Sequence, residues 1–185
     1  MQGNLIKKEQ LMRVETEHLI IRNFEQKDET DLGEYMLQRV EAEFERYENF
    51  TKENIPEEIK FRVESDEFYA IELKKNHKVI GNIYMGHRDF EARELGYVLN
   101  EEYQQKGYGS EAAKAAVEYF LQNGTRRIFA ECCPMNVASW KTMERIGMKR
   151  EAHLRKNVSF RKEPNGKPIY WDTYVYGILV EDRKA

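Results

Sequence analysis

A glycine-containing turn that opens a helix constrains this chain more than any other feature. The turn spans residues 104–110 (QQKGYGS), follows an apolar stretch at 94–99 and leads into an amphipathic one. Glycine lets the backbone approach an anion closely, and the first N–H groups of a helix carry roughly half a positive charge. The pattern therefore predicts a phosphate-binding turn. An ordinary loop with a helix cap at Ser110 is the alternative.

Two known phosphate-binding motifs fit this turn incompletely. Gly107, Gly109 and Ala112 satisfy GxGxxA, and Glu131 follows about 20 residues later, where a dinucleotide-binding fold has its ribose-binding acid. However, that fold's strand runs directly into the first glycine, whereas a polar stretch at 101–106 intervenes here. No Lys-Ser or Lys-Thr pair follows the second glycine, so a Walker P-loop fails too. A dinucleotide-binding oxidoreductase stays as one alternative function.

Hydrophobic periodicity predicts an alternation of strands and helices. Apolar residues at every third or fourth position predict helices at 30–47, 56–63, 109–122 and 137–146. Shorter apolar runs bounded by turn residues predict strands at 17–24, 68–74, 79–86, 94–99, 127–132, 149–159 and 169–180. The outer face of the first helix is acidic, and its carboxylates would either steer a cationic substrate or be a solvated surface.

Size and charge restrict the partners of the chain. At 185 residues it has the length of one domain, 1–185, with 1–13 as an appended or flexible segment. Its 30 Lys and Arg against 33 Asp and Glu give a net charge of −3, too negative to favour a nucleic-acid partner. No apolar run reaches the roughly 20 residues of a membrane span, and no signal peptide is apparent. We expect a cytoplasmic protein with neither a nucleic-acid nor a membrane partner.

The cysteines and histidines do not have the spacing of a metal or redox site. The adjacent Cys132 and Cys133 fit neither a disulfide framework nor a CxxC motif, and the four histidines are scattered without HExxH. A covalent route through a cysteine nucleophile would need an activating histidine, which the sequence does not place beside them. We predict reduced, structural cysteines and no metal.

Three motifs together resemble the GNAT superfamily of N-acetyltransferases. Gln104-x-x-Gly107-x-Gly109 resembles the (Arg/Gln)-x-x-Gly-x-(Gly/Ala) signature with which that family binds the pyrophosphate of acetyl-CoA. Residues 136–139 (NVAS) and 144–148 (ERIGM) are similar to the Asn-x-x-Ser and Glu-Lys-x-Gly-Phe patterns of its RimJ/RimL-like branch, the ribosomal-protein N-terminal acetyltransferases. The resemblance covers residues 17–180.

The resemblance implies a fold and an activity. The fold is an α/β (α+β) three-layer sandwich, in which a mixed, mostly antiparallel sheet of about seven strands is splayed centrally and has helices on both faces. The activity is transfer of the acetyl group of acetyl-CoA, without a metal, directly to a primary amine. The acceptor would be a protein or peptide N-terminal α-amine or a small amine, and a homodimer is the assembly that the resemblance allows.

The resemblance also implies a set of site residues. It places the cofactor on residues Tyr97, Val98, Leu99, Gln104, Gln105, Lys106, Gly107, Tyr108, Gly109, Ser110, Asn136 and Ser139. A backbone N–H near Val98 would polarise the thioester carbonyl. The acceptor pocket is expected to be lined by aromatic residues that would otherwise belong to the core, namely Phe44, Tyr47, Trp140, Trp171 and Tyr174.

Proton transfer is the least determined part of this prediction. Many family members have a tyrosine acid where this chain has Met143, so Ser139 is expected to supply or relay the proton to the leaving thiolate. Glu94 is the expected base, against the alternative of a solvated carboxylate at the end of a strand. Tyr97 is expected to pack against the cofactor rather than carry a proton. Since Met143 cannot act as an acid, a catalytically silent CoA-binding sensor is a second alternative function.

Overall fold

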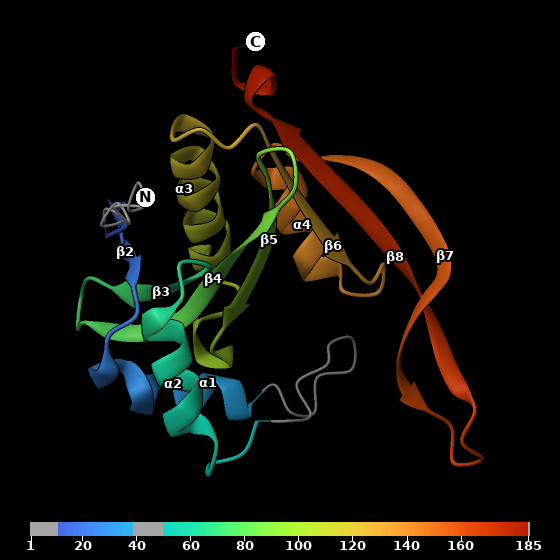
Figure 1. Ribbon diagram of the computed structural model, residues 1–185, viewed down its shortest axis with the longest axis horizontal. Coiled ribbons are helices and arrows are strands. Elements are labelled where there is room, and N and C mark those ends of the chain that lie inside the picture. The colour runs from blue at the N-terminus through green and yellow to red at the C-terminus, as the bar shows by residue number, and fades with distance from the viewer. Residues whose placement is uncertain (1–10, 39–49, 185) are drawn as a thin grey trace, which may run out of the picture.

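The computed structural model describes residues 11–38 and 50–184, which form one eight-stranded sheet flanked by four helices (Figure 1). The strand order is β1-β2-β3-β4-β5-β6-β8-β7, and every neighbouring pair is antiparallel except β5 and β6. The strands are β1 (Arg13–Glu15), β2 (Leu19–Asn23), β3 (Phe68–Leu73), β4 (Lys78–Arg88), β5 (Ala92–Leu99), β6 (Arg127–Cys132), β7 (Lys149–Lys162) and β8 (Pro168–Leu179). The helices are α1 (Glu29–Leu37), α2 (Ile55–Glu64), α3 (Tyr108–Gln122) and α4 (Val137–Arg145).

The element order predicted from the sequence is confirmed, with two differences. Strand β1 was not predicted, because three residues without an apolar run give no periodic signal; it pairs with β2 from Arg13 to Glu15 and raises the strand count to eight. The expected helix 30–47 appears as α1, which ends at Leu37, and its remainder from residue 39 on lies outside the described residues.

The helices cover both faces of the sheet, as the three-layer prediction requires. One core lies under α3 and α4, where small residues such as Ala112 and Ala116 let α3 approach the strands closely. A smaller core lies under α1 and α2 and includes Tyr35, Ile59 and Val98. Each face of the central strands therefore meets a different pair of helices.

The sheet is splayed between β5 and β6. These parallel strands pair only at Ala92–Arg127, Arg93–Ile128 and Glu94–Phe129, and the rest of β5 has no partner on that side among the described residues. On its other side β5 stays paired with β4, where Asn82 opposes Val98 and the N–H of Asn100 donates to Ile80 O at 2.8 Å.

This pairing fixes which backbone groups of β5 face the gap. Amide groups of successive residues point to opposite edges of a strand, and Asn100 donates toward β4. The amide groups of Val98 therefore also face β4, whereas those of Tyr97 and Leu99 face the gap. In agreement, the carbonyl of Leu99 accepts a hydrogen bond from Gln104 Nε2 at 3.2 Å, outside the ladder with β4.

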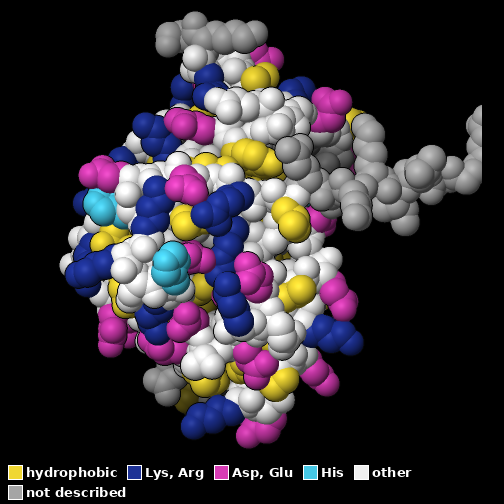
Figure 2. Space-filling view, turned by 90° about the vertical axis from the view of Figure 1, so that its left-hand side faces the viewer, with side chains coloured by type: hydrophobic (Ala, Val, Ile, Leu, Met, Phe, Trp, Pro, Cys, Tyr) yellow, Lys and Arg dark blue, Asp and Glu magenta, His cyan; other side chains and the backbone are white. Residues whose placement is uncertain are grey.

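The surface away from the gap carries both charged and hydrophobic side chains. Strands β7 and β8 extend beyond the other strands as a long twisted hairpin (Figure 1). On the face shown in Figure 2, Lys and Arg are interspersed with Asp and Glu, and hydrophobic side chains emerge in small groups. None of the described helices is both long and apolar enough to cross a membrane.

Candidate active site

A cavity of about 340 Å³ lies at the gap between β5 and β6, next to α4 and the start of α3; we call it the α3–α4 cavity. Ten of its lining residues are among those predicted to bind the cofactor, and four were not predicted. The predicted ones are Tyr97, Val98, Leu99, Gln104, Gln105, Gly107, Gly109, Ser110, Asn136 and Ser139, and the others are Ala138, Lys141, Thr142 and Arg145.

The turn before α3 presents backbone N–H groups to this cavity. Gly107 has φ +88°, and nothing lies within 4 Å of the position where a Cβ would be, so the backbone is open to a ligand. The first hydrogen bond of α3 runs from Glu111 N to Gly107 O at 3.0 Å. The N–H groups of Tyr108, Gly109 and Ser110 therefore have no acceptor within the helix. This arrangement suits an anion such as a pyrophosphate.

Two cationic side chains from α4 add to the positive character of the α3–α4 cavity. Arg145 Nη1 donates to Ser110 Oγ at 2.7 Å, which holds the guanidinium beside the start of α3, and Lys141 lines the same wall. Neither residue was predicted from the sequence. The sequence pattern that could have indicated them is the spacing of positions 138, 141 and 145, which share one face of the helix that Asn136 caps.

Two predicted residues of the turn direct their side chains elsewhere. Lys106 places its ammonium 5.3 Å from the centroid of the Tyr103 ring, and the Tyr108 ring packs 5.8 Å from that of His18. Neither side chain lines the α3–α4 cavity. Only their backbone groups remain as candidate ligands of an anion.

Two hydroxyl groups meet at Ser139. The Tyr97 hydroxyl donates to Ser139 O at 2.8 Å and lies 3.3 Å from Ser139 Oγ. Burial raises the pKa of the Cys132 thiol to about 11. Asn136 Oδ1 accepts from Ser139 N at 3.2 Å and so caps α4. Met143, at the position of the family's usual tyrosine acid, is buried in the core.

A second cavity, of about 490 Å³, lies on the opposite face of the sheet; we call it the α2 cavity. It shares Tyr97 and Val98 with the α3–α4 cavity, so the two approach each other at β5. Five of its eleven lining residues are aromatic, and the lining consists of Phe50, Glu58, Phe61, Arg62, Glu67, Phe68, Asn82, Tyr84, Gly96, Tyr97 and Val98.

Comparison with known proteins agrees with this geometry. The family described as acetyltransferase (GNAT) domain matches residues 18–149. The chain belongs to the GNAT acetyltransferase family. It is 35% identical over 177 residues, 92% of this chain and 99% of the relative, to the uncharacterized N-acetyltransferase YnaD of Bacillus subtilis. The chain is thus an acetyl-CoA-dependent N-acetyltransferase.

Solved structures of GNAT proteins share the fold. An acetyltransferase (GNAT family) from Bacillus anthracis superposes with a TM-score of 0.82 at 33% identity, covering 92% of this chain and 99% of that one. RimL, a ribosomal L7/L12 alpha-N-protein acetyltransferase solved with coenzyme A, gives a TM-score of 0.78 at 17% identity, with coverage of 92% and 99%. At that lower identity the likeness extends to the fold alone.

The α3–α4 cavity fits the acetyl-CoA that GNAT enzymes use. The free N–H groups at the start of α3, together with Arg145 and Lys141, match the charge of a pyrophosphate. The amide groups of Tyr97 and Leu99 at the gap match an arm that itself carries amides. In the described residues no group of three or more His, Cys, Asp or Glu could hold a metal ion.

The GNAT fold overturns the dinucleotide-binding alternative. A doubly wound sheet is mostly parallel, whereas among the described strands only β5 and β6 are parallel neighbours. Glu131, the supposed ribose ligand, lies on β6 between Ala130 and Cys132, which face the α3–α4 core. Because side chains alternate along a strand, Glu131 points to the other face, away from the glycine turn.

Two carboxylates lie on the α2 side of the splayed strands. Glu94, the predicted base, forms an ion pair with Arg88 and does not line either cavity. The Glu131 carboxylate has no hydrogen bond or ion pair to any described residue and, like Glu94, does not line either cavity. Although the Glu131 side chain is exposed, desolvation by its surroundings and the nearby charge of Glu94 raise the pKa of its carboxyl, and Arg88 opposes this. From the sequence, Glu131 was expected only as a ribose ligand.

The aromatic residues predicted for the acceptor pocket lie elsewhere or outside the described residues. Phe44 and Tyr47 fall in the segment 39–49, which is not described. Trp140 donates its indole N–H to a backbone carbonyl at 3.0 Å, and Trp171 stacks on another ring of the β7–β8 hairpin at 6.1 Å. Tyr174 lies under the guanidinium of Arg150. None of these last three lines the α2 cavity.

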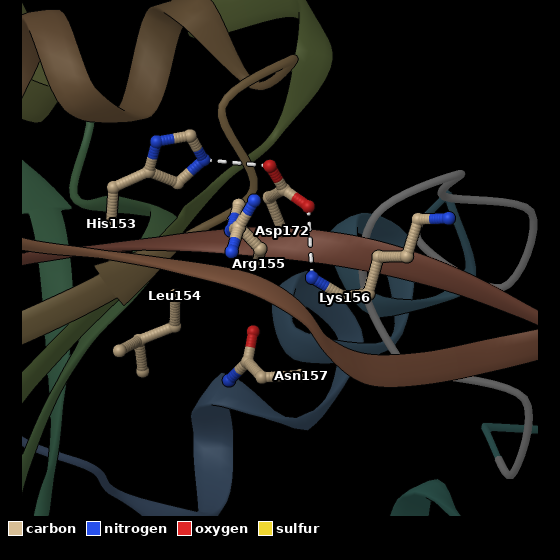
Figure 3. A pocket seen from close by; sticks show the side chains of 6 residues that line it. All are labelled: His153, Leu154, Arg155, Lys156, Asn157 and Asp172. Carbon is tan, nitrogen blue, oxygen red and sulfur yellow. Dashed lines mark hydrogen bonds and ion pairs between the residues drawn. The ribbon is translucent and has the colours of Figure 1, made fainter.

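A third hollow, of about 770 Å³, lies on the β7–β8 hairpin, away from β5 (Figure 3). It forms where β7 departs from the register of β8 between Leu154 and Val158. Asp172 bridges this irregularity, because its carboxylate is 2.6 Å from His153 Nε2 and accepts from Lys156 N at 2.9 Å (Figure 3). We interpret this hollow as the site of a bend in the hairpin.

Proposed function

We propose that this enzyme transfers the acetyl group directly from acetyl-CoA to a primary amine, either a protein or peptide N-terminal α-amine or a small amine, as in the RimJ/RimL-like branch. One observation carries the proposal: the α3–α4 cavity and the α2 cavity reach β5 from opposite faces and share Tyr97 and Val98. Two substrates that enter from opposite sides of the splay can react without an acyl-enzyme intermediate.

Binding of acetyl-CoA is assigned mainly to the backbone. The N–H groups of residues 108–110 and the side chains of Arg145 and Lys141 hold the pyrophosphate. Asn136 Nδ2 remains free to donate to the pantetheine arm, because its Oδ1 caps α4. Since Val98 turns its amide toward β4, we assign polarisation of the thioester carbonyl to the amide of Tyr97 or Leu99 instead.

The chemical step requires two proton movements. As the new C–N bond forms and the C–S bond breaks, the amine loses a proton and the leaving thiolate gains one. We assign the first proton to Glu131, on the acceptor side, in preference to the ion-paired Glu94. We assign the second to Ser139, whose hydroxyl lies in the α3–α4 cavity, 3.3 Å from that of Tyr97.

Calorimetry followed by an assay of CoA release tests this function. Acetyl-CoA is titrated into the protein with NADH as the control ligand, and CoA release is then measured with N-terminal peptides, polyamines and aminoglycosides. We expect selective binding of acetyl-CoA and release with at least one amine. Binding without turnover on any amine would instead support the CoA-binding sensor, and absence of acetyl-CoA binding would refute the proposal.

A further inference from the structure

A buried amide at the floor of the α2 cavity has an unused hydrogen-bond donor. Asn82 is 3% exposed, and its Oδ1 accepts from Arg62 Nη1 at 2.8 Å and from the Tyr35 hydroxyl at 3.1 Å. Arginine only donates, so the side-chain oxygen of Asn82 must face it and the nitrogen must face away. Asn82 Nδ2 has no hydrogen-bond partner among the described residues. Buried donors normally meet an acceptor atom, because leaving them unpaired is costly.

This donor lies close to the place where the two cavities approach each other. Asn82 lines the α2 cavity and is directly opposite Val98 on the neighbouring strand. Directly opposed residues of an antiparallel pair have Cβ atoms about 4.5–5.5 Å apart on the same face. A molecule whose amine reaches the gap at β5 therefore passes within reach of Asn82.

An aromatic wall stands beside this donor. The Phe68 ring lies 5.0 Å from the Tyr84 ring and 5.8 Å from the Phe61 ring, and these rings line the α2 cavity. The guanidinium of Arg62 is 4.6 Å from the Phe68 centroid. Its charge is already matched by Glu58, whose Oε1 is 2.7 Å from Arg62 Nε. The wall therefore offers an apolar aromatic surface to a ligand, and the charge of Arg62 is already paired.

We propose that the acceptor is an α-amino carbonyl compound, an amino-acid amide or a peptide N-terminus, with a large apolar side chain. This inference rests on the function proposed above. The acceptor's carbonyl oxygen accepts from Asn82 Nδ2, and its side chain packs on Phe61, Phe68 and Tyr84. A simple alkylamine has no oxygen to offer Asn82, and a small side chain leaves the aromatic wall uncovered.

Three amines of matched structure separate the two elements of the proposal. L-Phenylalaninamide and 2-phenylethylamine differ only by the carboxamide, and L-alaninamide lacks the ring. We expect kcat/KM to be at least about tenfold higher for phenylalaninamide than for alaninamide. The two phenyl amines differ in pKa, near 8 for an α-amine and near 10.4 for an alkylamine. For these two amines we therefore compare how a variant changes kcat/KM of each amine relative to wild type.

The variant Asn82→Asp tests the donor. Aspartate keeps an oxygen for Arg62 and Tyr35 but replaces the Nδ2 donor with an acceptor. We expect kcat/KM to fall at least about tenfold for phenylalaninamide and to change less than about twofold for phenylethylamine. Equal losses on both amines would overturn the role of Asn82. Circular dichroism and unchanged affinity for acetyl-CoA establish that the variant is folded.

The variant Phe61→Ser tests the aromatic wall without endangering the fold, because Phe61 is 55% exposed. We expect the preference for phenylalaninamide over alaninamide to fall at least about fivefold. Phe90→Ser, which removes an 85% exposed ring from the turn between β4 and β5, is the matched control and should leave the preference unchanged. An unaltered preference in Phe61→Ser would overturn the proposed compartment.

The same measurements distinguish failure of this inference from failure of the proposed function. If the enzyme acetylates polyamines or phenylethylamine efficiently and Asn82→Asp affects all amines alike, the acetyltransferase function holds and the acceptor class is wrong. If the wild-type protein does not bind acetyl-CoA in calorimetry, the function itself fails and the acceptor class fails with it.

Discussion

The two cavities that approach each other at β5 are built in different ways. The α3–α4 cavity is lined by three segments that are each continuous in the sequence, namely the end of β5 at 97–99, the turn at 104–110 and α4 with its cap at 136–145, and the turn contributes backbone N–H groups. The α2 cavity is made of side chains from α2, β3, β4 and β5, which the fold brings together from distant parts of the sequence. A site made of backbone groups tolerates many side chains but needs glycines at fixed positions, which form a recognisable sequence pattern. A site made of side chains from distant segments has no such pattern.

This difference supports the proposed assignment of acetyl-CoA to the α3–α4 cavity and of the acceptor to the α2 cavity. The nucleotide part of acetyl-CoA is the same in every reaction, and backbone N–H groups with a helix dipole suffice to bind it. The acceptor differs from one enzyme to another, and side chains set its identity. Substitutions on the α3–α4 side should therefore change cofactor affinity, and substitutions on the α2 side should change turnover or acceptor choice.

The largest expected effect is that of Glu131→Gln, on the α2 side of β6. Removing a general base costs roughly a hundredfold or more in kcat, and the affinity for acetyl-CoA should not change. The base must be ionised, so the wild-type rate at saturating amine falls as the pH drops through the raised pKa of Glu131. Glutamine should abolish this acid limb. If Glu94→Gln causes the larger loss, Glu94 is the base.

The next largest effect is expected for Gly107→Val, on the α3–α4 side. A β-branched residue at φ +88° is strained, and the turn should shift its N–H groups away from the pyrophosphate. Strain of this size corresponds to a roughly tenfold to hundredfold weaker binding of acetyl-CoA, measured by calorimetry. Gly124→Val, at φ +96° just beyond the other end of α3, introduces similar strain far from the site. Equal losses of affinity in both variants would show that the turn has no special role.

A pair of serine substitutions within the α3–α4 cavity sharpens the comparison further. Ser139→Ala should lower kcat roughly tenfold while the Kd of acetyl-CoA changes less than about twofold, because its hydroxyl is needed only as the thiolate leaves. Ser110→Ala frees Arg145 and should do the reverse, weakening binding about threefold with little change in kcat. Identical kcat values for Ser139→Ala and wild type would remove Ser139 from the mechanism.

The smallest effect is expected for Cys132, which lies on β6 and packs against the core under α3 and α4. With a pKa of about 11, its thiol is about one-thousandth ionised at pH 8, so iodoacetamide should modify it far more slowly than a free cysteine. Mass spectrometry of the alkylated peptide measures the rate. Cys132→Ala should retain at least about half of the activity. Rapid alkylation, or loss of activity in the alanine variant, would point to the covalent route.

Features determined by consecutive residues were predictable from the sequence, and features assembled from distant segments were not. The helix starting at Tyr108 and its glycine turn were predictable, since the residues that determine them are consecutive. Arg145 was missed because its role depends on Ser110, which another helix supplies. The aromatic wall was missed because Phe61 and Tyr84 belong to different elements. Glu94 is no longer the preferred base, because Arg88, on the other strand of its hairpin, forms an ion pair with it.

The splay at β5 also affects how the free protein behaves. It leaves an edge inside the sheet, because in the described part of the chain the pairing of β5 with β6 stops at Glu94, before Tyr97 and Leu99. Such an edge can pair with a foreign strand, and proteins commonly block it. Gln104 already covers the carbonyl of Leu99. An amide-bearing cosubstrate arm that covers the rest would slow hydrogen exchange at Tyr97 and Leu99, so the cosubstrate would act as the missing strand that protects this enzyme from aggregation.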